Sequence, residues 1–262
     1  MGVFYPLGTS PSDFLTYYAQ QFNTVEIDAT YYAIPGPKTV DNWVKKTPEN
    51  FIFAAKFPRS IVHGGKNNQP DPNVILKPEA VYKQRDMFLD VMRRLGDRRG
   101  PLLLQFPYFS KETYRSKEAF YELLDNFLDD LPDDFHYAVE IRNRLWLTEG
   151  FKKLLRKHHC ALTLVDHAWM PHGDEIAMKL DPFTTTFTYL RLLGDRREIE
   201  AVTKKWDKEV IDRGERLTRW VNLISKIKER QLKAFVYINN HYAGHAPATA
   251  RRLEKMLLAL NL

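Results

Sequence analysis

One stretch decides the fold class: PLLLQFPYFSKETYRSKEAFYELLDNFLDDLPDDFHYAVEIRN, residues 101–143. Its two ends, PLLLQFP (101–107) and HYAVEIRN (136–143), are rich in apolar, β-branched and aromatic residues and end in polar or turn-forming residues, which predicts β-strands. The segment 116–130 between them has helical periodicity. Strands that alternate with helices indicate a parallel sheet covered by helices.

The same pattern recurs along the rest of the chain. Five more strands are predicted, at 24–32, 51–58, 161–167, 187–194 and 234–241. Further helices are predicted at 11–21, 37–46, 78–95, 149–158, 207–231 and 246–260. Seven strand–helix repeats without a Gly-rich dinucleotide fingerprint favour a TIM-like (β/α) barrel of the α/β class, which needs ~250 residues.

Length and composition fit one globular domain over residues 1–262. Hydrophobic residues make up 44% and charged residues 27%, as in ordinary globular proteins. At ~150 residues per domain the length fits one large domain or two small ones. Because no linker rich in Gly, Ser or Pro divides the chain, we expect one. An eighth strand of the barrel would have to lie in residues 1–10.

Several classes of protein are excluded or disfavoured. No apolar run approaches the ~18 residues that span a bilayer, so we expect no membrane segment. The start, MGVFYPLGTS, does not resemble a signal peptide. The single cysteine, Cys160, excludes an intramolecular disulfide and a cysteine-based zinc site. We therefore expect a cytoplasmic protein.

The net charge of +6 comes mostly from one stretch. Residues 191–233 hold 13 Lys and Arg against 8 Asp and Glu, a net of +5. A local basic surface attracts phosphates, nucleic acid or acidic lipid. The alternative is a solvated helix with mixed charges.

Polar side chains recur near the same end of all seven predicted strands. They are Glu26, Asp28, Thr30, Lys56, Gln105, Glu140, Arg142, Asp166, His167, Arg191, Asn239, Asn240 and His241. Strands buried on both faces should be apolar throughout, and barrel active sites lie at the C-terminal strand ends. We therefore expect one shared pocket that contains Glu26, Lys56, Glu140, Arg142, Asp166, Arg191 and Asn240.

Roles follow from the chemistry of these groups. The catalytic candidates are Glu26, Lys56, Glu140 and Asp166, with Glu26 or Glu140 as the base, because a partly dry carboxylate can have its pKa tuned. The candidates for substrate binding are His63, Gln105, Arg142, Asn143, Trp146, Arg191, Asn239, Asn240 and His241. Arginine can hold an anion through a bidentate fork.

Structural alternatives stay open for the same residues. Glu140 and Arg142 could form an interior ion pair, and Lys56 could only neutralise a carboxylate. Asp166 could cap the following segment, and Asn239 and Asn240 could tie down a loop. His63 begins the Gly- and Asn-rich stretch 63–73, which is a lid or a long connection.

We expect neither a metal nor a cofactor. Glu26, Glu140, Asp166, His167 and His241 include suitable ligand types for a divalent ion, but none forms a tight metal motif. The chain also lacks a phosphate-binding loop of the Walker type, a dinucleotide fingerprint and a G-x-S-x-G nucleophile elbow.

Motifs along nearly the whole chain resemble one family, the YecE-like proteins, also called domain of unknown function 72. They are FYP (4–6), FNTVEIDATYY (22–32), Trp43, Pro48, Phe51, AAKFP (54–58), IVH (61–63), GPLLLQFPYF (100–109), AVEIRNRLW (138–146), YLRLLG (189–194) and YINNHYAGHAPATA (237–250). The resemblance implies a TIM-like barrel and brings no established reaction, substrate or cofactor. Barrels of this type include sugar isomerases and endonucleases, so a phosphate or carbohydrate ligand follows by analogy alone.

The chain departs from the family pattern twice. Family members usually begin with a strand and a Gly-Thr-Ser-Gly-Trp-type segment, whereas this chain starts just before FYP. We therefore expect the first strand of the barrel to be missing or truncated. Asp28 and Ala29 stand where an Asn-Thr-like pair is common, which leaves Glu26 intact.

Three functions remain in view. The favoured one is an enzyme, of the hydrolase type, that uses acid/base chemistry on an anionic small molecule or a phosphodiester. The first alternative is a nucleic-acid-binding protein that uses residues 191–233 with Trp206 and Trp220, and its binding would depend steeply on salt. The second is a barrel that binds a metabolite without catalysis. The sequence does not predict an oligomeric state.

Overall fold

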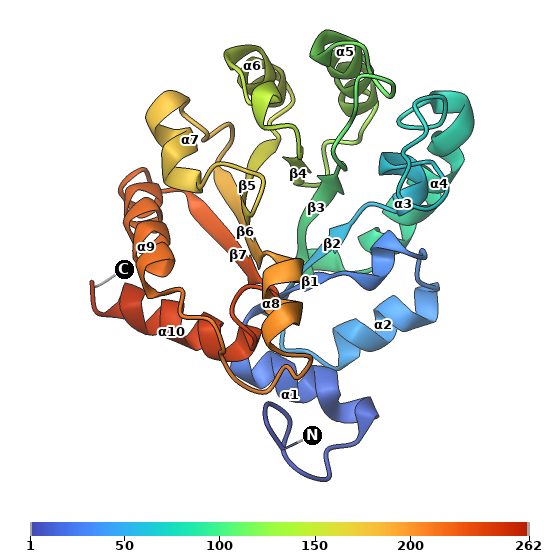
Figure 1. Ribbon diagram of the computed structural model, residues 1–262. Helices are drawn as coiled ribbons and strands as arrows, with labels where there is room; N and C mark the ends of the chain where they lie inside the picture. Colours follow the sequence, from blue (N-terminus) through green and yellow to red (C-terminus); the bar gives the residue numbers. More distant parts are fainter. Residues whose placement is uncertain (1, 261–262) are drawn as a thin grey trace. The chain divides into compact units, whose positions relative to one another are not determined.

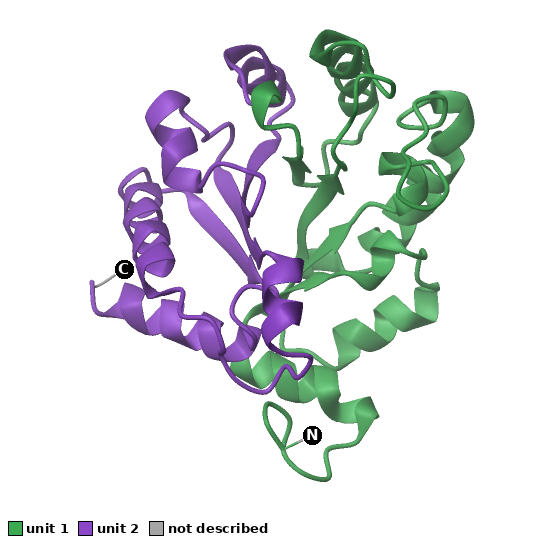
Figure 2. Ribbon diagram, in the orientation of Figure 1, with its two compact units in different colours: residues 1–146 green, residues 147–262 purple. Residues whose placement is uncertain are grey.

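The computed structural model describes residues 2–260, which form two compact units that divide between Trp146 and Leu147 (Figure 2). Both units consist of strands that alternate with helices, as the sequence predicts. The single domain over residues 1–262 stays a prediction. Within residues 2–260 no helix is long and apolar enough to cross a membrane.

Unit 1 contains four parallel strands that pair in sequence order. They are β1 (Thr24–Ile27), β2 (Ile52–Lys56), β3 (Arg99–Gln105) and β4 (Tyr137–Glu140). The helices are α1 (Phe14–Gln21), α2 (Pro37–Lys45), α3 (Arg59–Val62), α4 (Pro78–Arg93) and α5 (Lys117–Asp129). Short 3-10 turns are η1 (Pro11–Asp13), η2 (Ala29–Tyr31), η3 (Gly96–Arg98) and η4 (Arg144–Trp146). In Figure 1, α2, α4 and α5 lie along one face of these strands.

Unit 2 contains three parallel strands. They are β5 (Ala161–His167), β6 (Phe187–Gly194) and β7 (Lys233–Ile238). The helices are α6 (Glu149–Lys157), α7 (Gly173–Lys179), α8 (Arg196–Val202), α9 (Gly214–Glu229) and α10 (Ala246–Leu258). Helices α7, α9 and α10 lie along one face of the strands (Figure 1).

Each unit has its own apolar core. In unit 1, Phe57 after β2 packs on Phe88 of α4, with ring centroids 5.0 Å apart. In unit 2, α9 buries Leu217 and Trp220 completely. Each apolar side chain of this size stabilises the fold by about 1.5–3 kcal/mol when it leaves water. The helix periodicity that the sequence shows therefore marks the faces that hold each unit together.

In unit 1, the predicted strands 24–32 and 136–143 extend furthest beyond the observed C-terminal ends. β1 ends at Ile27 because the Thr30 hydroxyl donates to the Ile27 carbonyl (3.0 Å) and closes a turn, so Asp28 and Thr30 do not lie on a strand. β4 ends at Glu140, because Asn143 is held by the backbone of Phe109. The charged residues near these ends therefore stand on turns rather than on a pleated surface.

β2 and β3 also end two residues before the predicted ends of their strands, at Lys56 and Gln105. Further differences lie in unit 2 and in short helices. β7 ends at Ile238, before the turn that holds Asn239. The predicted helix 207–231 begins only at Gly214, because the preceding backbone pairs elsewhere: the Val210 N–H donates to the Ala243 carbonyl (2.7 Å). Helices α3, α7 and α8 were not predicted, since each has fewer than eight residues and too little periodicity. Residues 2–10 form no strand.

Candidate functional site

Lys56 ends β2 as a buried cation between two carboxylates. Its Nζ lies 3.5 Å from Glu26 Oε1 and forms an ion pair with Asp28. The Lys56 N–H also donates to the Thr30 hydroxyl (3.1 Å), which fixes the turn after β1 against β2. Glu26 and Lys56 thus meet as the sequence predicts, although Asp28 reaches them from a turn.

Glu140 and Arg142 form a second charged pair in unit 1. The Glu140 carboxylate is completely buried, and Arg142 Nε donates to its Oε1 (2.5 Å). A buried carboxylate without a cation would cost several kcal/mol. Arg142 therefore has a structural task, whatever else it does.

Tyr31, which the sequence analysis did not select, joins the two pairs. Lys56 Nζ lies 5.9 Å from the centre of its ring, on the face. Burial raises the pKa of the Tyr31 phenol, while Arg59, through its charge and a hydrogen bond, and Arg142, through its charge, act in the opposite direction. One half-buried phenol thus lies among three cations at the C-terminal ends of β1, β2 and β4.

Tyr31 also lines a cavity of about 870 Å³ in unit 1. The wall comes from the turn after β1, from α3 and from α4, and includes Tyr32, Arg59, Lys83, Gln84 and Met87. No Asp or Glu of the described residues lines it. The cavity is large enough for a drug-sized ligand, and its fixed side-chain charge is positive.

Arg59 holds the loop that follows α3. Its guanidinium donates to the carbonyls of Gly65 (2.8 Å) and Asn67. Within residues 2–260 it makes no ion pair with a carboxylate. A Cβ on Gly65 would lie 1.9 Å from the Gln69 carbonyl oxygen, so only glycine permits this loop. The loop is therefore built around an arginine whose charge no carboxylate of the described residues neutralises.

His63 supports this loop rather than lining the cavity. Its Nδ1 accepts from the Gly65 N–H (3.3 Å), and the side chain is buried. Burial, followed by the charge of Arg59, lowers the pKa of His63. The ring is thus a neutral acceptor near neutral pH.

Two other predicted binding residues of unit 1 anchor the chain. Asn143 is buried, accepts from the Phe109 N–H (2.9 Å) and donates to the Phe109 carbonyl (2.8 Å). Trp146 packs on Phe109 and Phe120, with ring centroids 5.8 and 5.4 Å apart. Gln105 is half-buried at the end of β3. These contacts favour structural roles for Asn143 and Trp146.

Asp166 is the centre of a saturated cluster in unit 2. Its buried carboxylate accepts from Trp220 Nε1 (2.8 Å) and from two nitrogens of Arg216. Burial alone would raise the pKa of Asp166, but these hydrogen bonds outweigh it and hold the pKa below its usual range. Burial, and next the carboxylate, raise the pKa of the Tyr242 phenol beside it. With its oxygens occupied, Asp166 is better placed to hold α9 than to accept a proton from a substrate.

His172, also unpredicted, extends this cluster to α7. Its Nδ1 lies 2.7 Å from Asp174 Oδ1, and its Nε2 lies 3.6 Å from Asp166 Oδ2. Burial lowers the pKa of His172 despite both carboxylates. Asp174 is also held by Arg219 (2.5 Å), and its pKa falls to about 2 although burial opposes the fall.

The remaining predicted residues of unit 2 are spread over a strand and a turn. Arg191 is buried on β6, and His167 ends β5 half-buried. The Asn239 side chain accepts from the His241 N–H (2.9 Å), and the Asn240 side chain accepts from the Ala246 N–H at the start of α10 (2.8 Å). Both asparagines therefore tie down the last loop. That the candidates of both units share one pocket stays a prediction.

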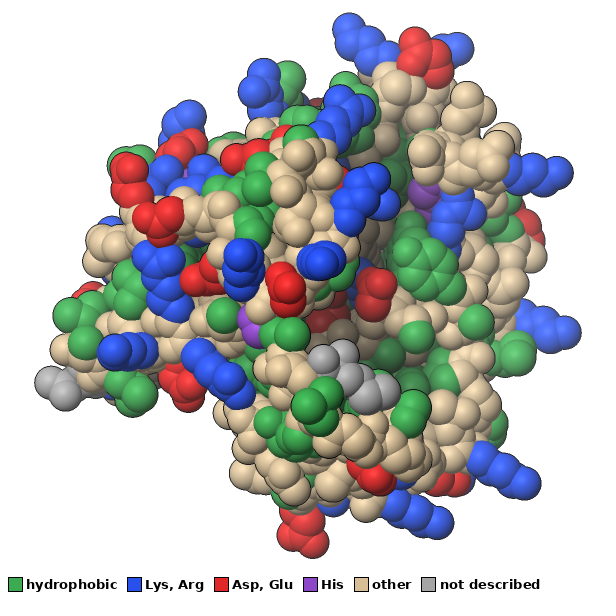
Figure 3. All heavy atoms as spheres, turned by 60° about the horizontal axis from the view of Figure 1, so that its bottom comes forward, with side chains coloured by type: hydrophobic (Ala, Val, Ile, Leu, Met, Phe, Trp, Pro, Cys, Tyr) green, Lys and Arg blue, Asp and Glu red, His purple; other side chains and the backbone are tan. Residues whose placement is uncertain are grey.

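Several arginines of the basic stretch 191–233 already form ion pairs with carboxylates. Arg213 pairs with Glu198, and Arg216 and Arg219 pair with the two aspartates of the cluster. Trp220 is completely buried, so it cannot stack on a base. On the face that Figure 3 shows, Lys and Arg side chains alternate with Asp and Glu. These observations favour the mixed, solvated surface over a nucleic-acid platform.

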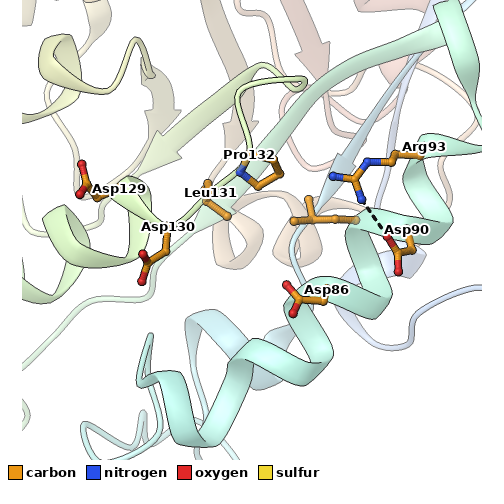
Figure 4. A pocket seen from close by; sticks show the side chains of 8 residues that line it. Asp86, Asp90, Arg93, Asp129, Asp130, Leu131 and Pro132 are labelled. Carbon is orange, nitrogen blue, oxygen red and sulfur yellow. Dashed lines mark hydrogen bonds and ion pairs between the residues drawn. The ribbon is translucent and has the colours of Figure 1, made fainter.

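A second cavity in unit 1, of about 370 Å³, is acidic. It lies between the ends of α4 and α5 and is lined by Asp86, Asp90, Asp129 and Asp130 (Figure 4). Three of these carboxylates already have protein partners: Arg85 donates to Asp86, Arg93 to Asp90, and the Tyr82 hydroxyl to Asp130. Within residues 2–260 no group of three or more His, Cys, Asp or Glu could hold a metal ion.

Sequence reasoning missed Tyr31, Arg59 and His172 for one reason. All three lie beyond the strands, on turns or short helices. The motifs TYY after the first strand and FPRS after the second were the available signals for Tyr31 and Arg59. Most candidates come from one face of the predicted strand ends, whereas βα-loops supply most of a barrel's site.

Fold and site together define the class: a TIM-like α/β barrel protein with charged and aromatic groups at the C-terminal strand ends. The chain belongs to the DUF72 family, "Protein of unknown function DUF72", whose model matches residues 1–261. This confirms the family and the fold class predicted from the sequence.

Individual relatives and solved structures support the same family assignment. The chain is 32% identical to the UPF0759 protein YecE of Escherichia coli K12, over 61% of this chain and 56% of YecE, so it spans little more than half of that protein. It is 26% identical to the UPF0759 protein YunF of Bacillus subtilis, over 97% of this chain and 89% of YunF.

A DUF72 family crystal structure from Thermotoga maritima MSB8 has a TM-score of 0.71 at 26% identity, over 98% and 94% of the two chains. A glycoside hydrolase family 5 enzyme from Prevotella bryantii B14, crystallised with a xyloglucan oligosaccharide, has a TM-score of 0.50 at 11% identity, over 95% and 86%. The second likeness concerns the fold alone.

Proposed function

We propose that this protein is an enzyme that acts by acid/base chemistry on an anionic, phosphate-bearing or carbohydrate substrate at the C-terminal ends of β1–β4. The observation that carries the proposal is the cavity of about 870 Å³, lined by Arg59 and Lys83 and by no carboxylate of the described residues. Such a wall attracts an anion, and arginine can bind it through two parallel hydrogen bonds.

Glu26 is the best candidate for the base. Its carboxylate is 11% exposed and lies 3.5 Å from Lys56 Nζ, whereas Glu140 is completely buried against Arg142. A base must come within hydrogen-bond reach of the substrate proton, which favours the more exposed group. Lys56 lies on the ring of Tyr31, which lines the cavity, so these groups connect the anion site to the base.

The experiment is a thermal-shift screen with sugar phosphates, nucleotides and oligonucleotides, followed by turnover assays on the phosphate esters that stabilise the protein. Glu26→Gln should reduce turnover at least 100-fold, since a general base contributes about 10²–10⁴-fold. The matched control is Glu118→Gln on α5, whose carboxylate is 68% exposed beside Lys117.

Three outcomes would contradict the proposal. They are no stabilisation by any phosphate compound, no turnover of any binding ester, and equal turnover by wild type and Glu26→Gln. Binding of oligonucleotides alone, with steep salt dependence, would instead favour the nucleic-acid alternative.

We also propose a cytoplasmic location, which rests on the cysteine content: the single Cys160 is buried and forms no disulfide.

A further inference from the structure

We infer that the cavity of unit 1 takes a phosphate joined to a planar heteroaromatic ring, the chemistry of a nucleoside monophosphate. This inference rests on the proposed function, because it uses the same anion site, and it names the class of substrate. Its additional basis is an aromatic and apolar wall beside the cations.

The wall contains two adjacent aromatic rings. Tyr31 and Tyr32 follow β1, and their ring centroids lie 5.3 Å apart at an interplanar angle of 87°. Two perpendicular rings present one face and one edge, which suits stacking on a planar ligand with an edge contact beside it.

This wall is also unusually exposed. Tyr32 is 75% exposed and Met87 of α4 is 52% exposed, and both line the cavity. Large apolar side chains gathered around one hollow mark a binding site, whereas single ones scattered over a surface do not. A ring seated here would cover both side chains.

The polar groups fit the rest of such a ligand. Arg59 and Lys83 supply positive charge for the phosphate, and Gln84, one residue further along α4, supplies an amide that can both donate and accept at a base edge. A free sugar lacks the aromatic face, and a bare phosphate would leave most of about 870 Å³ unfilled.

Calorimetric titration with three probes tests this inference: adenosine 5′-monophosphate, ribose 5-phosphate and adenosine. We expect the nucleotide to bind at least fivefold more tightly than ribose 5-phosphate, because its base can stack on an aromatic side chain and ribose 5-phosphate has no base. Tyr32→Ser should abolish that preference while leaving ribose 5-phosphate binding unchanged. The control is Tyr108→Ser, because Tyr108 is 60% exposed in unit 1 and does not line the cavity.

The outcomes separate this inference from the proposed function. Equal affinity for the nucleotide and ribose 5-phosphate, or an unchanged preference in Tyr32→Ser, would overturn the inference and leave the anion site intact. Failure of both phosphates to bind would overturn the two together. Binding of adenosine as tightly as the nucleotide would contradict the role of Arg59 and Lys83.

Discussion

The two units place charged side chains near strand ends in opposite ways. In unit 2, the arginines of α9 and Trp220 occupy the oxygens of Asp166 and Asp174. In unit 1, Arg59 donates to backbone carbonyls and makes no ion pair with a carboxylate of the described residues, although it lines an open cavity.

The difference shows what separates a structural charge from a candidate binding group. Position at the end of a parallel strand does not distinguish a structural charge from a binding group, because Asp166 and Glu26 both lie at such an end. The distinguishing feature is whether a protein partner of opposite charge already neutralises the group. A saturated buried pair specifies and stabilises the fold, whereas a cation without a carboxylate beside a cavity can accept an anionic ligand.

The largest expected loss of stability comes from a substitution in the Asp166 cluster of unit 2. Asp166→Ala leaves Arg216 and the buried Trp220 N–H without their acceptor, so we expect the free energy of unfolding to fall by about 3–5 kcal/mol. Urea unfolding measures it. The control is Asp181→Ala, whose partly exposed pairs with Arg156 and Arg230 should contribute less than about 1 kcal/mol. Equal losses in both variants would show that the cluster is not special.

A second variant pair examines the ion pair of unit 1. Arg142→Met removes the cation that pairs with the completely buried Glu140 carboxylate, so we expect the free energy of unfolding to fall by about 3 kcal/mol. The double variant with Glu140→Leu should recover most of it, because apolar residues of similar size often replace a buried pair at little cost. If the double variant is as unstable as Arg142→Met, packing rather than charge explains the loss.

The effect of pH on the free energy of unfolding should be smaller than the effects of these substitutions. It has one contribution from a histidine and one from two aspartates. The pKa of His172 is depressed in the folded state, so the unfolded chain binds a proton first and stability falls as the pH drops below about 6.5. Asp166 and Asp174 have depressed pKa values, so their contribution is present above about pH 4 and decreases as the pH falls below it. For Asp174, whose pKa is about 2, the contribution is lost between about pH 4 and 2.

Unfolding at pH 7, 5 and 3 measures both parts. His172→Gln should reduce the loss in the free energy of unfolding between pH 7 and 5. It should not abolish that loss, because the buried His63 and His245 also have lowered pKa values and contribute to it. Equal stability of the wild type at pH 7 and 5 would contradict the assignment of a neutral, buried His172.

Much of the fold could be predicted from the sequence, because periodicity records which faces are buried. The strands at 161–167 and 187–194 and the helix from Pro78 match closely. The ends of β1 and β4 could not be predicted, because a Thr30 hydroxyl bond and the Asn143 side chain, rather than apolar pattern, stop them. Local side-chain hydrogen bonds compete with strand pairing and leave little trace in composition.

The candidate site was predicted less completely. The pairs Glu26–Lys56 and Glu140–Arg142 followed from the need to compensate interior charge. Arg59 was missed because a short helix of four residues carries it, and its partners are loop carbonyls that any sequence supplies. The hydrogen bonds that Arg216 donates to Asp166 could not be predicted either, since Arg216 lies 50 residues away on another element.

Arg59 of unit 1 is proposed to bind an anion, whereas the arginines of α9 in unit 2 are expected to stabilise the fold. Calorimetric titration of inorganic phosphate into the wild type, Arg59→Gln and Arg216→Gln, each first shown to be folded, tests it most directly. We expect Arg59→Gln to raise the Kd at least tenfold, about 1.4 kcal/mol, and Arg216→Gln to change it less than twofold. A Kd that responds to Arg216→Gln and not to Arg59→Gln would contradict the account.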